Sequence, residues 1–116
     1  MDETIYISIC YLKGEIRLFK STIIGLNIPS YVKIYVNKER DLLAITSDKD
    51  KTLLTHKIPK NIYDKKWKMI VYSKKLCNVL YEKMQWDRSK SYRIPGEIME
   101  KGAVACFELK KANISG

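Results

Sequence analysis

Apolar and polar residues alternate near the start of the chain. Isoleucines occupy every second position of residues 5–9, which is the spacing of a strand with one buried face. Residues 15–21 repeat this alternation after Lys13-Gly14, a turn sequence in which glycine can supply the positive φ that a tight hairpin needs. We therefore predict a hairpin over residues 4–21.

A second alternating region follows at residues 31–46. Two runs rich in valine, isoleucine and leucine are separated there by the polar stretch 37–40, NKER, which is typical of a four-residue hairpin loop. The segment before it, 22–31, contains Gly25 and Pro29 and is too short for more than one or two helical turns. The sequence thus predicts a short helical segment and then a second hairpin.

The pattern changes to a helical period after a mostly polar stretch. Residues 67–73 have the composition of a strand, and Ser73 has the side chain of an N-cap. Leu76, Leu80 and Met84 then recur at four-residue intervals, so an amphipathic helix is predicted over about 73–86.

Two further strands, 91–99 and 103–110, complete the predicted elements. Gly102 lies in the turn between them, and Pro95 is expected at a sheet edge or a bulge because it cannot donate to a ladder.

These elements define an α+β fold, mostly antiparallel β with one main amphipathic helix. The 116 residues suit a single domain over 1–116. We divide it into a first half at about 4–46, a linker at about 47–66 and a second half at about 67–110. The order strand, helix, strand, strand occurs at 15–46 and again at 67–110, which predicts an internal βαββ duplication.

Charge is the strongest compositional signal. The chain has 22 Lys and Arg against 13 Asp and Glu, a net charge of +9. An excess of cations favours a polyanion partner, because phosphates are attracted by counterion release. The alternative is that these lysines form an ordinary solvated surface.

The distribution of the basic residues favours nucleic acid, because aromatic side chains are interleaved with lysines between residues 57 and 75. The candidate residues for binding nucleic acid or a partner are Lys57, Lys60, Lys65, Lys66, Trp67, Lys68, Lys74, Lys75, Arg88 and Arg93. Arg93 has two interpretations. It is either aimed at a phosphate or carboxylate, or paired with Glu82 or Glu97.

Catalytic chemistry has little support in the sequence. His56 is the only histidine, and the three cysteines, Cys10, Cys77 and Cys106, lie in apolar segments where we expect them to pack in the core. We therefore expect no enzyme activity, no catalytic residue, no metal and no cofactor. The chain also has no run of 18 apolar residues, so we expect no membrane association and a cytoplasmic location.

Two resemblances bear on function. The two βαββ halves resemble the swapped-hairpin fold of the AbrB and MraZ transcription regulators, although the usual signature arginine is missing between Gly25 and Pro29. The pieces "YSK" at 72–74, "QWD" at 85–87 and "YRIPGE" at 92–97 resemble small proteins of Gram-positive bacteria and their phages. This second resemblance implies a phage or mobile-element origin and, for a phage gene, the host cytoplasm.

Two functions follow as hypotheses. The first is a small basic regulator that binds nucleic acid, with a homodimer as one form. The second is a phage-encoded inhibitor of host defence, such as an anti-CRISPR protein, that binds a defence protein or its nucleic-acid complex. A net charge of +9 argues against mimicry of DNA, which needs an acidic surface.

Overall fold

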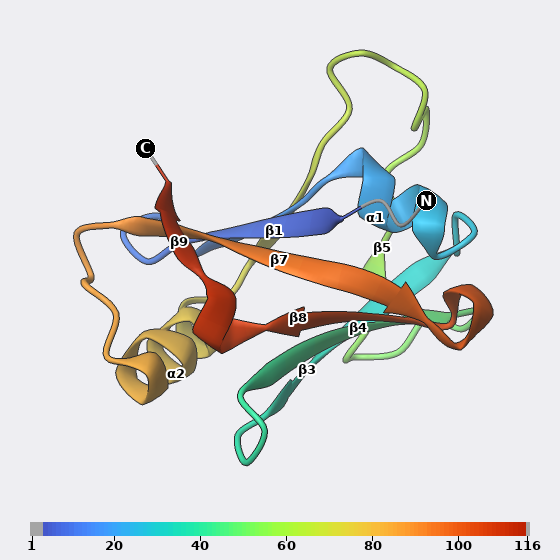
Figure 1. Cartoon of the computed structure of the whole chain (residues 1–116). Coiled ribbons are helices and arrows are strands. Elements are labelled where there is room, and N and C mark those ends of the chain that lie inside the picture. The colour runs from blue at the N-terminus through green and yellow to red at the C-terminus, as the bar shows by residue number, and fades with distance from the viewer. Residues whose placement is uncertain (1–3, 116) are drawn as a thin grey trace.

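The computed structural model describes residues 4–115. Within that range it has nine strands, two α-helices and two 3-10 turns (Figure 1). The strands are β1 (Ile5–Cys10), β2 (Glu15–Leu18), β3 (Tyr31–Asn37), β4 (Leu42–Asp48), β5 (His56–Lys57), β6 (Met69–Tyr72), β7 (Ser91–Met99), β8 (Val104–Glu108) and β9 (Asn113–Ser115). The helical elements are α1 (Lys20–Gly25), α2 (Lys74–Met84), η1 (Glu100–Gly102) and η2 (Leu109–Lys111).

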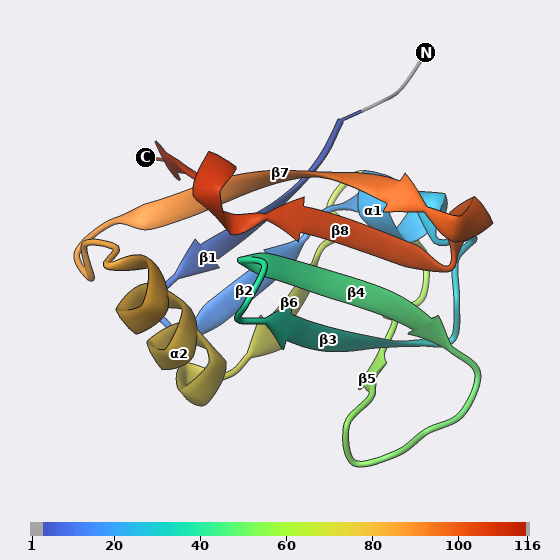
Figure 2. The same cartoon turned by 60° about the horizontal axis from the view of Figure 1, so that its bottom comes forward.

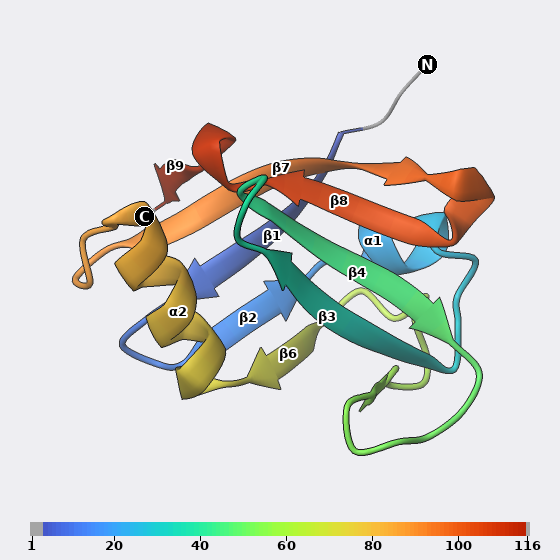
Figure 3. The same cartoon turned by 90° about the horizontal axis from the view of Figure 1, so that it is seen from below.

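All strand pairs are antiparallel and belong to one sheet that curls into a nearly closed barrel (Figures 2 and 3). The strand order is β5-β3-β4-β8-β7-β1-β2-β6, and β9 pairs with β7 beside this path. No pairing joins β5 to β6 within residues 4–115. The predicted α+β class, with mostly antiparallel strands and one main helix, is confirmed.

The core lies on the inner face of the barrel because the strands alternate. In β1, Ile5, Ile7 and Ile9 are buried while the residues between them face outward. The two helices cover opposite ends of the barrel, α1 beside the end of β7 and α2 beside the turn between β1 and β2 (Figures 2 and 3). The outer face of the sheet therefore carries the side chains that are free to meet a ligand.

Helix α2 has the predicted position and cap. The Oγ of Ser73 accepts a hydrogen bond from the N–H of Leu76 at 3.2 Å, and Gln85 ends the helix in the left-handed region at φ 56°. The face that contains Cys77, Leu80 and Tyr81 is buried. The expectation of a helix over about 73–86 is confirmed within two residues at the C-terminal end.

An aromatic cluster connects α2 to the sheet. The Tyr81 hydroxyl accepts from the N–H of Tyr11 at 3.3 Å and donates to the Lys90 carbonyl at 2.7 Å. The Trp86 ring stacks on Tyr92 with 4.6 Å between ring centroids, and the Asp87 N–H donates to the Tyr92 hydroxyl at 2.9 Å. The "QWD" and "YR" pieces of the sequence thus close the helix onto the sheet.

Three details differ from the predictions. Pro95 does not lie on an edge strand, since β7 is between β8 and β1. On one side β7 pairs with β9 through residues 91–93 and with β8 through residues 96–99, so no partner on that side faces Pro95. The stretch 47–66 is not a plain linker, because β4 extends into it and β5 forms within it.

The cysteines also differ in part. Cys77 is buried as expected, but Cys10 and Cys106 are half-buried on the outer face of the sheet. They follow the outward positions of β1 and β8, which alternate with buried residues.

No helix in residues 4–115 combines the length and the apolar character that are needed to cross a bilayer.

Candidate nucleic-acid interface

Two arginines flank a serine on the outer face of three adjacent strands. Ser8 of β1 is opposite Arg17 of β2 on one side and Arg93 of β7 on the other. Their neighbours along each strand, including Ile7, Ile16 and Ile94, are buried, so the three polar residues share the outer face. Neighbouring strands lie about 4.8 Å apart, which places the two arginines about 10 Å apart at the backbone.

Aromatic rings hold the Arg93 guanidinium in place. Its Cζ lies 4.9 Å from the centre of the Tyr6 ring and 5.5 Å from the centre of the Phe19 ring. Within residues 4–115 it has no ion pair, so neither Glu82 nor Glu97 neutralises it. Two cation–π contacts restrain the side chain without using its N–H donors, which stay free for an anion.

Arg17 is held more weakly. Its guanidinium lies 3.8 Å from the carboxylate of Glu15, which is beyond hydrogen-bond distance. The Glu15 side chain is 14% exposed and that of Arg17 is 41% exposed, so the arginine reaches further into solvent than its partner. An anion can therefore contact Arg17 without first breaking a tight bidentate pair.

A shallow hollow of about 430 Å³ lies over these residues. Lys13 also lines it, and Ser8, Ser91 and Ser115 contribute hydroxyl groups to its lining. Three cationic side chains and three hydroxyl groups outnumber the one carboxylate, that of Glu15, and form a donor set that suits a phosphate group. We call the hollow and its lining residues the arginine site.

Cys10 reports on the electrostatics of the arginine site. Burial raises the pKa of its thiol, but hydrogen bonds from Ser91 and from the backbone at Lys13 and Leu12 outweigh burial, so the pKa lies below its ordinary value. These hydrogen bonds and the charge of Lys13 favour the thiolate form of Cys10.

Of the sequence-predicted residues, Arg93 lines the arginine site, whereas Lys74 and Arg88 lie beside the turn between β1 and β2. The aliphatic stem of Lys74 lies against Gly14, which has φ 63° in the turn between β1 and β2, and the guanidinium of Arg88 lies 5.2 Å from the ring centre of Tyr11 in the same turn. Lys74 and Arg88 therefore add positive charge beside the turn that contains Lys13.

The remaining predicted residues lie elsewhere. Lys57 belongs to β5 at the far end of the strand order, and Lys75 is exposed in the first turn of α2. The others follow the segment 58–68: Lys60, Lys65, Lys66 and Lys68 are exposed there, and the indole N–H of Trp67 donates to the Pro59 carbonyl. The Lys20 ammonium donates to the Asp64 carbonyl at 2.9 Å, which places this segment beside the start of α1. It forms a separate basic surface.

Sequence reasoning missed Arg17, Ser8, Lys13 and Ser91. The alternation in residues 15–21 puts Arg17 opposite the apolar face, which was a usable signal. The pairing of β1 with β7 was not visible, because nothing in either strand alone shows that Ser8 lies opposite Arg93.

Comparison of the chain with models of protein families, with curated proteins and with solved structures gives no match.

Proposed function

We propose that this protein binds single-stranded nucleic acid, with a backbone phosphate at the arginine site. The observation that carries the proposal is the Arg93 guanidinium, which is restrained between two aromatic rings and has no ion pair within residues 4–115. Arg93 and Arg17 lie on opposite sides of Ser8, so the site presents two guanidinium groups to one phosphate backbone.

A single strand suits the face better than a duplex. The same outer face of β6 carries Tyr72, which is 69% exposed and lies opposite Glu15 in the sheet register. An exposed ring beside a cationic hollow offers stacking to an unpaired base, whereas the bases of a duplex are already stacked. The net charge of +9 adds long-range attraction to either form.

A salt titration tests the proposal. Fluorescently labelled single-stranded RNA, single-stranded DNA and duplex DNA are titrated with the protein at roughly 50 and 200 mM salt. About three phosphate contacts to a single strand predict a loss of affinity on the order of 20-fold between these conditions. We expect such a loss for a single strand, and weaker binding of the duplex.

Two sets of variants locate the site. Arg17→Gln together with Arg93→Gln should weaken binding by at least about tenfold, since charge-assisted contacts are lost. The control variant removes one charge more, from the segment 58–68, through Lys65→Gln, Lys66→Gln and Lys68→Gln. If the control weakens binding and the arginine pair does not, the site lies on the lysine surface and the arginine site is wrong.

We also infer an internal duplication, which the strand pairings support. Exchanging β1 with β5, β2 with β6, β3 with β7 and β4 with β8 turns the pairings along the strand order into pairings that are also observed. The pairings of β4 with β8 and of β2 with β6 are turned into themselves, and the exception is the pairing of β1 with β2. The counterpart of that pairing would join β5 to β6. In both halves a hairpin also follows the helix. An AbrB-like regulator of phage origin remains a hypothesis that agrees with this order.

Docking onto a protein of the host defence is the second candidate function. Leu53 is fully exposed and Leu54 is 71% exposed in the loop between β4 and β5. Contact with a partner protein removes such apolar side chains from water and is therefore favourable. If no nucleic acid binds at the lower salt, this function takes first place, and Leu53→Ser with Leu54→Ser should abolish co-purification with the defence component.

A further inference from the structure

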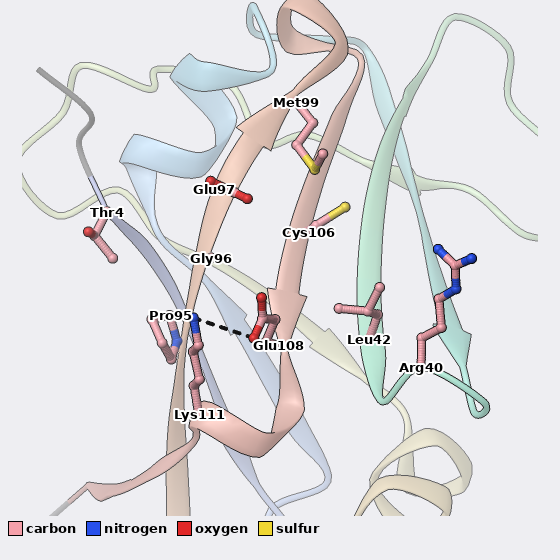
Figure 4. A pocket seen from close by; sticks show the side chains of 10 residues that line it. All are labelled: Thr4, Arg40, Leu42, Pro95, Gly96, Glu97, Met99, Cys106, Glu108 and Lys111. Atoms are coloured by element: carbon pink, nitrogen blue, oxygen red, sulfur yellow. Dashed lines mark ion pairs between the residues drawn. The ribbon is translucent and has the colours of Figure 1, made fainter.

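A second hollow lies on the same outer face as the arginine site. Its volume is about 610 Å³, within the range of about 300–1,000 Å³ that is typical of small-molecule sites. Figure 4 shows it over β7, β8 and β4, with Leu42, Cys106 and Met99 around its apolar part and charged side chains at its rim. We call it the acidic hollow because Glu97 and Glu108 both line it; Arg40 and Lys111 also line it and balance their charge.

Strands β1 and β7 connect the two hollows. Ser8 and Arg93 line the arginine site, the next outward pair is Tyr6 and Pro95, and Pro95 already lines the acidic hollow. Arg93 and Glu97 are four residues apart on one strand, or about 13 Å at the usual rise. A nucleic-acid strand held at the arginines can therefore place a neighbouring base in the acidic hollow.

The cysteine thiols in the two hollows have different surroundings. Burial raises the pKa of Cys106 in the acidic hollow, and the charges of Glu97 and Glu100 raise it further, whereas the Cys10 thiol in the arginine site has a lowered pKa. The carboxylates of Glu97 and Glu108 can accept hydrogen bonds from a donor in this hollow. The carboxylate of Glu108 is shared with Lys111 at 3.4 Å, but Glu97 has no ion pair within residues 4–115.

We propose that the acidic hollow binds a nucleobase that carries an amino group, and that the Glu97 carboxylate accepts a hydrogen bond from this group. Cytosine, adenine and guanine have such a donor, whereas uracil and thymine present a carbonyl at the equivalent edge. The apolar wall supplied by Leu42, Pro95 and Met99 offers contact to the flat ring. This inference rests on the proposed function, because the phosphate at the arginines brings the base to the hollow.

The experiment compares oligocytidine and oligouridine RNA of equal length and label at one salt concentration. The two bases have the same ring size and differ in the group at position 4, so the ratio of their affinities isolates the amino group. We expect oligocytidine to bind roughly five- to tenfold more tightly, the low end for one good base contact. Glu97→Gln should bring the ratio close to one, because an amide can donate to uracil as well as accept from cytosine.

Glu39→Gln is the matched control. Glu39 is exposed in the turn between β3 and β4, so its substitution removes the same charge without changing the acidic hollow. Both variants should raise affinity slightly through net charge, but only Glu97→Gln should change the ratio. Equal affinity of the wild-type protein for both RNAs, with binding still dependent on Arg17 and Arg93, overturns this inference and leaves the proposed function intact. If neither RNA binds, this inference is overturned, and the proposed function is overturned with it when the single-stranded DNA of the salt titration also fails to bind.

Discussion

Strands β1 and β5 occupy corresponding places in the topology but have different structures. Each precedes a strand, a helix and a hairpin along the chain. β1 has six residues and pairs on both sides, with β2 and with β7, whereas β5 has two residues and, within residues 4–115, pairs only with β3. A short turn at 11–14 follows β1, and the irregular segment 58–68 follows β5.

The difference has a local cause. After β5, the N–H of Ile58 still donates to the Ser30 carbonyl at 3.1 Å, but Pro59 has no N–H and pairing stops there. The segment then fills the barrel opening in another way. Ile62 is buried, and the indole N–H of Trp67 donates to the Pro59 carbonyl at 3.1 Å. An irregular segment can thus complete a barrel without strand pairing, provided that it buries apolar side chains and that its buried polar groups form hydrogen bonds.

The largest expected effect is the loss of folding stability when a buried isoleucine of β1 is replaced, compared with the loss when an isoleucine after β5 is replaced. Ile9 of β1 is fully buried, and Ile58 after β5 is 8% exposed. Ile9→Ala should lower the free energy of unfolding by about 2–5 kcal/mol, because rigid strands on both sides leave the cavity open. Ile58→Ala should cost less, because the irregular segment can relax into the space. Urea denaturation measures both, and an equal or larger loss for Ile58→Ala would contradict the comparison.

A smaller effect is expected from the hydroxyl that fixes the end of β1. Tyr81→Phe removes the acceptor of the Tyr11 N–H and the donor to the Lys90 carbonyl. The expected loss is about 1–3 kcal/mol in the free energy of unfolding, the usual cost of a buried polar group left without its partner. Tyr63→Phe is the control, since Tyr63 is exposed. A loss no larger than that of the control would mean that this hydroxyl does not stabilise the end of β1.

The smallest expected effect is the dependence of folding stability on pH that comes from His56 of β5. Burial lowers the pKa of His56 from its ordinary 6.5, so the folded protein binds this proton more weakly than the unfolded chain. The stability that depends on His56 is full above pH 6.5, falls as the pH drops through that value and levels off below the folded pKa. His56→Gln should therefore lose less stability than the wild-type protein between roughly pH 7.5 and pH 5.5 in thermal unfolding.

The wild-type protein and the variant should show the same pH dependence below that window, where carboxylates such as Asp41 and Asp48 titrate. Hydrogen bonds from Lys83 to Asp41, and from the backbone at Asp50 to Asp48, hold the pKa of each carboxyl below its ordinary value. Identical curves over the whole range would show that His56 has the same pKa in the folded and unfolded states.

Local patterns predicted the local structure well. The alternation in residues 5–9 and the four-residue spacing from Leu76 to Met84 have direct physical causes in the pleat of a strand and the pitch of a helix. β5 was missed because two residues are too few for a pattern to appear. Which strands pair across the chain depends on the whole barrel, so the opposition of Ser8 and Arg93 could not be predicted from either segment.

The candidate site was likewise predictable where it depends on single residues of the sequence, and not where it depends on strand pairing. Arg93 was a candidate because of its charge, with an anion or an ion pair to Glu82 or Glu97 as its two interpretations. Its restraint by Tyr6 and Phe19 needs residues from three separate strand regions, which the sequence places far apart. The lysines between 57 and 75 stood out as a run, but a run in the sequence is no guide to which face of the sheet it reaches.

The pairing of β1 with β7 also determines when the protein can fold during synthesis. Ile7 lies opposite Ile94, so β1, which is synthesised early, cannot complete its pairing until β7 has been synthesised. Until β7 emerges, the apolar side of β1 has only β2 as a neighbour and a hairpin alone is marginally stable. Barrel closure is therefore expected after translation is nearly complete, and nascent chains that end before residue 91 should be sensitive to proteases and bound by chaperones.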